Sequence, residues 1–526
     1  MSGRHPTTSL WSLVEWRAAQ TPGGEMLVDE RARRVTFGEF RDRAGRVAAG
    51  LAGRGVGPGT PVTWQLPTTV EALVLTAALA RLGAVQNPVM PVYGPRDLGF
   101  VVRQTGARLL VVAPEWNGRD LATPARQIAD DSPALDLIIA DGDLPESEAA
   151  PPPGPPESAS APPAPDDPVR WIFYTSGTTA DPKGARHTDA SVLASARGMG
   201  ERLACTPADR VGMVFPVAHI GGCGSWLGAC LMYGCTLILD AVFDPERTTE
   251  LQRRERVTLA GSGTVFIQIY LAAQRRDPRN RLFPDVRAMT GGAAPKPPTL
   301  HADVKREIGG GGGLSGYGLT EAPILTMAAT DDPDEALAAT EGRANEGVDL
   351  RVVGADGRVL GPGQEGELRA RGPQVMRGYV DAALDAGAFD AGGYLRTGDL
   401  GRLDSGGNVT ITGRLKDVII RKGENISAQA AEEELLRHPG VADVAVIGLP
   451  DPEAGEMACA VIVPPEGRPA PTLAQLTAFL RESGVPKRQW PERLEVVGAL
   501  PRNATGKVLK AELRQRYGAP AGQRAG

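Results

Sequence analysis

The sequence predicts an α/β protein with more than one domain, and three observations support this. Before residue 342, helix-like runs alternate with short apolar strand-like runs, as in βα units that build a largely parallel sheet. Residues 342–404 change to hairpin-like segments, and from about residue 417 the chain mixes strands and helices in a smaller α+β unit. A chain of 526 residues exceeds one simple core, since roughly 150 residues per domain are typical.

The individual elements follow from the same patterns. A polar lead enters a short amphipathic helix at the start, and we expect no signal sequence there. Helix-like runs lie at 40–55, 70–84 and 428–438. Short buried strands are expected within the ranges 108–114, 135–141, 169–177, 211–219, 235–240, 257–263, 286–292, 417–423, 441–449 and 459–465. The Asp356-Gly357 pair predicts a hairpin turn, and the five glycines at 309–313 predict a flexible turn.

One connector stands out by composition. Residues 149–168 are a Pro/Ala/Ser tract that cannot pack a core, so we expect an extended, exposed segment. The tract could separate two domains or be an insertion between two lobes of one domain. The sequence leaves both arrangements open.

Composition and charge exclude several classes. The net charge is −6 and the basic residues are scattered, so no nucleic-acid partner is indicated. No apolar run approaches the roughly 20 residues of a membrane-spanning helix. None of the five cysteines forms a CxxC pair, which argues against a zinc site or a disulfide framework. Reduced thiols lead us to expect a cytoplasmic enzyme.

Residues 174–188, YTSGTTADPKGARHT, have the composition of a phosphate-binding loop. A strand-like run leads directly into them, and backbone N–H groups at such a junction bind anions. The loop offers hydroxyl donors, a glycine for close approach and a lysine: Thr175, Ser176, Gly177, Thr178, Thr179 and Lys183. It is not a Walker A loop, because Pro182-Lys183-Gly184 stands where Gly-Lys-Ser/Thr would be required. A solvated Ser/Thr/Gly turn is the alternative interpretation.

This loop resembles the phosphate loop of the adenylate-forming superfamily, which includes acyl-CoA synthetases, firefly luciferase and the adenylation domains of peptide synthetases. Ala180 replaces a glycine of the family pattern. Further segments match in the family's order, and the resemblance covers essentially the whole chain: TGGAAP (290–295), GYGLTEA (316–322), YLRTGDLG (394–401), GRLKDVIIRKGENIS (413–427) and PRNATGKVLK (501–510). The chain is most similar to bacterial medium-chain or cyclohexanecarboxylate-type acyl-CoA ligases.

The resemblance implies a fold. It predicts a large N-terminal domain, residues 1–415, of mostly parallel sheets flanked by helices with a small β-barrel-like lobe. A small, mobile α+β C-terminal domain, residues 416–526, would carry the catalytic lysine and swing about a hinge at Lys416. The active site would then lie between the two domains.

The resemblance also implies residue roles. The catalytic residues would be Lys507, Thr320, Glu321 and His219, with Glu321 holding Mg²⁺. ATP and AMP would be bound by the phosphate loop residues named above together with Gly292, Ala293, Ala294, Tyr317, Gly318, Asp399 and Arg414. Tyr317 would stack on adenine and Asp399 would accept the ribose hydroxyls. Taken singly, these residues have other interpretations: Tyr317 could be a core aromatic, Asp399 a turn former, and the lysines solvated surface charges.

The acyl and pantetheine pocket is expected at FPVAHIGGCG (215–224) and at neighbouring segments. By resemblance its residues would be His219, Ile220, Gly221, Val265, Phe266, Gly291, Gly316 and Gly423. No acidic residue follows His219 where amino-acid-activating relatives often keep an aspartate, so an uncharged acid is favoured. A histidine satisfied within the core is the alternative for His219. Ser315 replaces the family's frequent glutamine.

The expected function is an ATP-dependent acyl-CoA ligase for a medium-chain, alicyclic or aromatic acid, with ATP, Mg²⁺ and coenzyme A required. Three alternatives remain. The acceptor could be the phosphopantetheine of a carrier protein, it could be an unusual acceptor in a biosynthetic pathway, or the chain could bind nucleotide without catalysis. A homodimer is possible, since dimers occur in the family.

Overall fold

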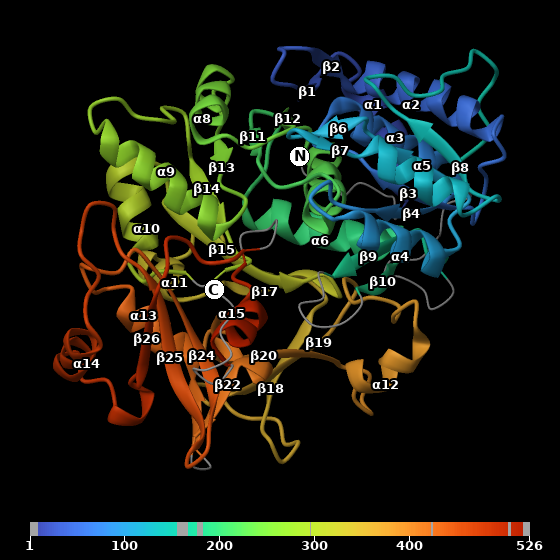
Figure 1. The fold of residues 1–526 in the computed structure, drawn as a ribbon. Helices are drawn as coiled ribbons and strands as arrows, with labels where there is room; N and C mark the ends of the chain where they lie inside the picture. The colour runs from blue at the N-terminus through green and yellow to red at the C-terminus, as the bar shows by residue number, and fades with distance from the viewer. Residues whose placement is uncertain are drawn as a thin grey trace.

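The computed structural model describes residues 9–154, 167–175, 182–294, 296–421, 424–502 and 507–518. Two large sheets and their helices form the N-terminal part, and two smaller sheets lie below them in the view of Figure 1. Within the described residues no helix is both long and apolar enough to cross a membrane. The five cysteines are all buried and free of disulfide bonds.

The first large sheet holds the strand that leads into the phosphate loop. Its strand order is β10-β9-β4-β3-β5-β8, parallel throughout except that β10 and β9 are antiparallel. The bounds are β3 (Pro61–Gln65), β4 (Val85–Pro88), β5 (Leu109–Val112), β8 (Asp136–Ile139), β9 (Trp171–Thr175) and β10 (Lys183–His187). A separate short hairpin is formed by β6 (Glu115–Trp116) and β7 (Arg119–Asp120).

The second large sheet has a parallel centre and antiparallel edges. Its order is β17-β16-β15-β14-β13-β11-β12-β1-β2. The bounds are β1 (Glu25–Val28), β2 (Arg34–Thr36), β11 (Arg210–Met213), β12 (Thr236–Leu239), β13 (Leu259–Ala260), β14 (Ala288–Gly291), β15 (Gly313–Leu319), β16 (Ala322–Met327) and β17 (Arg343–Ala344). The glycine run forms the turn before β15, and Gly309, Gly310 and Gly312 have positive φ there, which glycine adopts without strain.

Helices cover both sheets, and their starts follow ordinary capping rules. The bounds are α1 (Leu10–Gln20), α2 (Phe37–Ala52), α3 (Val70–Leu82), α4 (Pro95–Thr105), α5 (Ala122–Asp130), α6 (Asp189–Arg202), η1 (Ile220–Trp226), α7 (Leu227–Tyr233), α8 (Pro245–Arg254), α9 (Thr264–Arg276), α10 (Leu300–Asp303), η2 (Val304–Ile308) and α11 (Asp334–Ala339). Capping boxes open α2, from Thr36 and Glu39, and α6, from Thr188 and Ser191. The α6 helix packs against η1, α7 and β16 near the centre of the molecule (Figure 1).

The third sheet is antiparallel, in the order β18-β19-β20-β21, and it is the lobe that the resemblance predicted as barrel-like. Its strands are β18 (Asp349–Val353), β19 (Gly366–Arg371), β20 (Leu395–Leu403) and β21 (Val409–Arg414), with η3 (Ala382–Leu384) and α12 (Asp385–Ala388) between β19 and β20. The predicted turn at Asp356-Gly357 is present, with Gly357 at a φ of 82°.

The C-terminal unit follows η4 (Leu415–Asp417) and has its own apolar core. Its elements are β22 (Val418–Arg421), β23 (Glu424–Ser427), α13 (Ala428–Leu435), β24 (Asp443–Asp451), β25 (Gly455–Val463), α14 (Leu473–Glu482), η5 (Lys487–Gln489), β26 (Arg493–Val496) and α15 (Lys510–Gly518). The predicted fold class, a large N-terminal α/β domain with parallel sheets and a smaller C-terminal α+β domain, is therefore confirmed.

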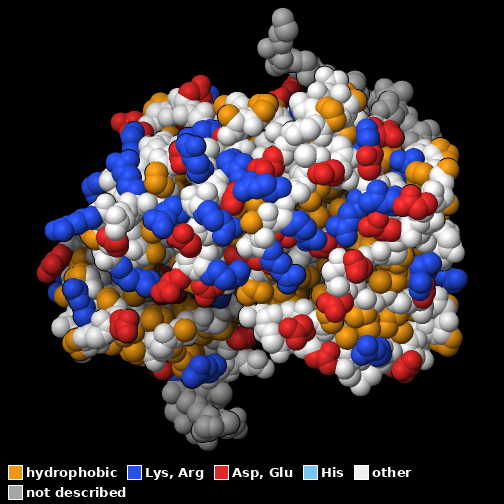
Figure 2. All heavy atoms as spheres, turned by 90° about the horizontal axis from the view of Figure 1, so that it is seen from above, with side chains coloured by type: hydrophobic (Ala, Val, Ile, Leu, Met, Phe, Trp, Pro, Cys, Tyr) orange, Lys and Arg blue, Asp and Glu red, His pale blue; other side chains and the backbone are white. Residues whose placement is uncertain are grey.

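The surface carries both signs of charge. On the face shown in Figure 2, Lys and Arg side chains are interspersed with Asp and Glu side chains. Across the described residues many charged side chains form ion pairs, such as Arg275 with Glu307 at 2.6 Å. Exposed pairs of this kind contribute little to stability, typically about 0–1 kcal/mol each.

Candidate active site

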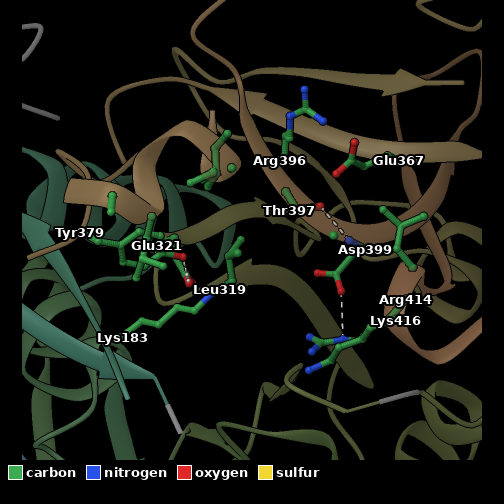
Figure 3. Close-up of a pocket in the computed structure, with 17 residues that line it drawn as sticks. Lys183, Leu319, Glu321, Glu367, Tyr379, Arg396, Thr397, Asp399, Arg414 and Lys416 are labelled. Carbon is green, nitrogen blue, oxygen red and sulfur yellow. Dashed lines mark hydrogen bonds and ion pairs between the residues drawn. The ribbon is translucent and has the colours of Figure 1, made fainter. Parts of the chain in front are cut away.

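A cavity of about 610 Å³ lies where β10, the β15–β16 turn, β20 and η4 meet. Five residues singled out in the sequence line it together: Lys183, Glu321, Asp399, Arg414 and Lys416 (Figure 3). The first and last of them are more than 200 positions apart along the chain, so the fold brings distant sequence motifs into one cavity. The segment that holds η3 and α12 supplies a largely apolar wall.

Lys183 is the first residue of β10 and lies opposite Thr175, the last residue of β9. Along the chain, the phosphate loop is therefore the connection between these two strands, and Lys183 at its end lines the cavity. The predicted loop residues Ser176, Gly177, Thr178 and Thr179 lie outside the described residues. The Nζ of Lys183 is 5.6 Å from the ring centroid of Tyr379, within the range of a cation–π contact.

Thr320 and Glu321 form the turn between β15 and β16. The Tyr379 hydroxyl donates a hydrogen bond to Oε1 of Glu321 at 2.7 Å. The Thr320 carbonyl accepts a hydrogen bond from Nε2 of buried His187 at 2.9 Å. Burial lowers the pKa of His187 to about 4, so the ring is neutral near pH 7 and carries its proton on Nε2.

Asp399 and Arg414 are cross-strand partners on β20 and β21. Arg414 Nε lies 2.9 Å from Oδ1 of Asp399, and the Tyr317 hydroxyl donates to Oδ2 at 2.8 Å. Burial, followed by the neighbouring Asp399 carboxylate, raises the pKa of Tyr317 well above its ordinary value, so its hydroxyl stays protonated. Tyr317 is only 8% exposed and does not line the cavity, and its predicted stacking on adenine stays a prediction.

Lys507 lies close enough to the cavity residues to be perturbed by them. Its pKa is lowered to about 7, first by burial and then by the positive charges of Arg414 and Lys416, while the carboxylates of Asp399 and Asp417 act in the opposite direction. The pKa of Lys416 is also lowered, first by burial and then by Arg414. Arg414 and Lys416 line the cavity, and Lys507 lies near enough to both for their charges to act on it.

The predicted acyl segment, residues 215–224, runs from Phe215 into η1. His219 precedes this π-helix, and its Nδ1 accepts a hydrogen bond from the N–H of Gly221 at 3.0 Å. Burial lowers the pKa of His219 to about 4, so the ring is neutral. Phe215 packs edge-on against it, with ring centroids 4.6 Å apart. Ile220, the first residue of η1, is buried.

The other predicted lining residues gather at the ends of β14 and β15. The Thr264 N–H at the start of α9 donates to the Gly292 carbonyl at 3.2 Å, which places Val265 and Phe266 beside the turn formed by Gly291, Gly292, Ala293 and Ala294. A Cβ on Gly292 would lie 2.8 Å from the Gly316 carbonyl oxygen, so only glycine permits this approach of the two strands. At Gly318 a Cβ would lie 2.4 Å from the Ile324 nitrogen. The predicted Gly423 lies outside the described residues.

Two residues of the site have no counterpart among the sequence predictions. His187 could have been found, because the period-two alternation of a strand puts it on the same face of β10 as Lys183. Tyr379 carried no such signal, since its place depends on the pairing of residues 377–380 with β10.

A large α/β domain with parallel sheets, a smaller α+β domain, and a cavity lined by Lys183, Arg414 and Lys416 fit the class of AMP-forming acid–thiol ligases. The chain belongs to the AMP-binding enzyme family: that family matches residues 14–380, and the AMP-binding enzyme C-terminal domain matches residues 430–507. Lys183 and Glu321 lie within the first matched region and Lys507 within the second, whereas Asp399, Arg414 and Lys416 lie between the two.

Individual relatives and structures agree with this assignment. The medium-chain fatty-acid–CoA ligase of Escherichia coli (strain K12) is 30% identical over 96% of this chain and 90% of its own. The salicyl-AMP ligase / salicyl-S-ArCP synthetase of Mycobacterium tuberculosis is 33% identical over 93% of this chain and 86% of its own. ATP-bound MatB from Rhodopseudomonas palustris superposes with a TM-score of 0.86 at 28% identity, covering 97% of this chain and 99% of that one.

Proposed function

We propose that the protein is an ATP-dependent acyl-CoA ligase for an uncharged carboxylic acid of medium-chain, alicyclic or aromatic type. The observation that carries this proposal is that Lys183, Glu321, Asp399 and Arg414 line one cavity, with Lys507 near enough to Arg414 and Asp399 to be affected by their charges. Cationic groups beside carboxylates suit a ribonucleoside triphosphate, because the cations can pair with the phosphates and a carboxylate can accept hydrogen bonds from the ribose hydroxyls.

The first half-reaction joins the acid to AMP. A carboxylate oxygen of the acid attacks the α-phosphorus of ATP, and the bond from that phosphorus to the bridging oxygen breaks to release pyrophosphate. Negative charge spreads over the phosphoryl oxygens in the transition state, so the protein needs cations and donors rather than a covalent nucleophile. Lys183 and Lys507 would supply the cations, and the Thr320 region would supply donors near the α-phosphate.

The residues present also fit Mg²⁺ in its usual mode. Within the described residues no cluster of three or more His, Cys, Asp or Glu side chains could hold a metal ion alone. Mg²⁺ in nucleotide enzymes is typically held by one or two carboxylates together with substrate phosphates, and Glu321 is a carboxylate in the cavity. Bound there with ATP, the ion would neutralise phosphate charge.

The second half-reaction needs the thiol of coenzyme A at the acyl carbon. The sulfur attacks this carbon, the acyl–phosphate oxygen bond breaks, AMP leaves, and the thiol proton passes to solvent. For this step we propose that residues 416–526 rotate as a domain relative to residues 1–415, with Lys416 in η4 absorbing the change in backbone angles. Lys507 would then leave the cavity, and the loop that contains Gly423 would approach the thiol.

The neutral environment of His219 supports an uncharged acid. Its ring is buried and unprotonated, Ile220 and Gly221 follow it, and Phe215 covers it. None of these groups could pair with a substrate ammonium ion, whose burial without a partner would cost several kcal/mol.

A carrier-protein phosphopantetheine is the second candidate for the acceptor. The similarity to the salicyl-AMP ligase / salicyl-S-ArCP synthetase favours it, because that relative's name specifies a carrier. The same cavity residues would serve both acceptors, since only the second half-reaction differs. A homodimer and a cytoplasmic location stay predictions.

The test is mass spectrometry of the products formed from ATP, Mg²⁺, coenzyme A and a panel of acids. The panel contains straight-chain C4–C12, cyclohexanecarboxylic, benzoic and cinnamic acids, with an amino acid as a control. We expect acyl-CoA from one chemical class and none from the amino acid. Acyl-AMP without thioester would favour the carrier protein, and the absence of both products for every acid would contradict the proposal.

The lowered pKa of Lys507 predicts proton uptake when ATP binds. At pH 8 a group with a pKa of about 7 is mostly neutral, and the phosphates of ATP favour its charged form. Binding should therefore take up as much as about 0.9 proton, and ATP affinity should fall as pH rises above 7. Calorimetry in two buffers of different ionisation enthalpy measures this uptake. Lys507→Met should abolish it, and equal enthalpies for the wild type in both buffers would contradict the prediction.

A further inference from the structure

Tyr379 lies between the two groups that the proposed function assigns to phosphate and metal. Its hydroxyl donates to Oε1 of Glu321 at 2.7 Å, and its ring centroid is 5.6 Å from Nζ of Lys183. The side chain lines the cavity, yet the residue is only 6% exposed (Figure 3). One side chain thus contacts both an anion and a cation of the site.

The backbone on both sides of Tyr379 is fixed by β10 and by the β15–β16 turn. Residues 377–380 extend the sheet beside β10, with a bridge between Tyr379 and Ala185 and a 2.8 Å bond from the Val380 N–H to the Gly184 carbonyl. The Tyr379 N–H donates to Oδ1 of Asp385 at 2.8 Å. The N–H of Met376 donates to the carbonyl of Glu321 at 2.8 Å. The position of the ring is therefore set from several directions.

The hydrogen bond between Tyr379 and Glu321 has a fixed donor and a fixed acceptor. The Tyr379 hydroxyl is the donor, because its partner at 2.7 Å is a carboxylate oxygen of Glu321, and the tyrosine is buried. Hydrogen bonds to a charged acceptor are shorter and stronger than neutral ones. The bond fixes one carboxylate oxygen of Glu321 and so restricts the rotamers open to that side chain, while the ring face favours a nearby ammonium group.

We propose that Tyr379 is a positioning residue: it holds the Glu321 carboxylate in the orientation that receives Mg²⁺ and keeps the Lys183 ammonium beside it. The inference rests on the proposed function and deepens it. A positioning role differs from that of an ordinary core tyrosine in its expected effect. Loss of the Tyr379 hydroxyl should change how strongly Mg²⁺ increases ATP affinity, and it should leave folding intact.

Tyr379→Phe tests the inference, because it removes the hydroxyl and keeps the ring. Tyr394→Phe is the matched control, because Tyr394 is also buried and donates to a carboxylate, that of Asp349, in the third sheet outside the cavity. Both variants should fold, as shown by melting temperatures close to that of the wild type. Calorimetric titration with ATP, with and without Mg²⁺, then measures how much the metal strengthens binding.

We expect the Mg²⁺-dependent gain in ATP affinity to fall about tenfold in Tyr379→Phe and to stay unchanged in Tyr394→Phe. In the assay with the best acid, the Mg²⁺ concentration at half-maximal rate should rise about tenfold. The kcat should fall about tenfold and the KM for the acid should not change. An unchanged metal response in Tyr379→Phe, or an equal change in Tyr394→Phe, would overturn the inference.

The calorimetric measurement also separates this inference from the proposed function. If no acid yields acyl-AMP or thioester with the wild type, the proposed ligase activity fails. The titration would still report whether Tyr379 sets the metal response of ATP binding. If the wild type forms products but Tyr379→Phe titrates like the wild type, the function stands and the inference fails.

Discussion

Replacing Lys507 with alanine is expected to lower the rate of acyl-adenylate formation about 10²–10³-fold, equivalent to roughly 3–4 kcal/mol of transition-state stabilisation. In the proposed reaction the half-buried Lys507 would supply positive charge where phosphoryl charge develops, and alanine supplies neither charge nor donor. Pyrophosphate release in a single turnover measures this step. Transfer from a pre-made acyl-adenylate to coenzyme A should proceed at close to the wild-type rate, because that step is proposed to occur after Lys507 has left the cavity.

The control for Lys507→Ala is Lys487→Ala, which removes an exposed lysine of the same C-terminal unit. It should leave both half-reactions unchanged. An equal loss of both half-reactions in Lys507→Ala would contradict the proposal that Lys507 acts in adenylate formation and not in thioester formation. It would then place Lys507 in a structural role or in both steps.

Replacing Asp399 with asparagine should remove the recognition of the ribose. Each hydrogen bond to a charged acceptor is worth about 1.5–3 kcal/mol, so the loss of two ribose contacts predicts a drop of about 10²-fold or more in kcat/KM for ATP. Folding should survive, because Arg414 keeps a side chain that is 35% exposed and can be solvated when its partner loses its charge. Initial rates at varied ATP concentration measure the effect.

A comparison of nucleotides makes this second prediction specific. The wild type should strongly prefer ATP to 2′,3′-dideoxy-ATP. Asp399→Asn should show little preference, because it lacks the carboxylate that is expected to accept hydrogen bonds from both ribose hydroxyls. Asp349→Asn, which alters a carboxylate of the same sheet outside the cavity, should retain the preference. A preference that persists in Asp399→Asn would place ribose recognition elsewhere.

Much of the architecture was predictable because the relevant signals are local. Alternating apolar runs identified β9, β12 and β14, and the Asp356-Gly357 pair marked its turn. The strand expected within 211–219 ends at Met213, since Pro216 and the π-helix after His219 redirect the chain there. Backbone period and turn chemistry act over a few residues, so one sequence suffices to read them.

The candidate site was only partly predictable, for the opposite reason. Lys183, Glu321, Asp399 and Arg414 belong to short motifs, and the structure brings them together. The role of Tyr379 depends on pairing between residues almost 200 positions apart, which leaves no local pattern. The shape of the predicted acyl pocket would depend on how η1 packs against β16 and α9 against β14, and side-chain packing of that kind is not encoded by spacing.

The gathering of Arg414, Lys416 and Lys507 has a consequence for the order of events in a turnover. Like charges in a poorly solvated place repel, and the lowered pKa values of both lysines are the measure of that repulsion and of burial. A triphosphate would neutralise most of it, whereas the acyl-adenylate that stays after pyrophosphate has departed carries much less negative charge. The arrangement with Lys507 beside Arg414 and Lys416 would therefore be most stable while ATP is bound and least stable just after the adenylate has formed. The loss of pyrophosphate would itself favour the rotation of residues 416–526 that is proposed for the second half-reaction.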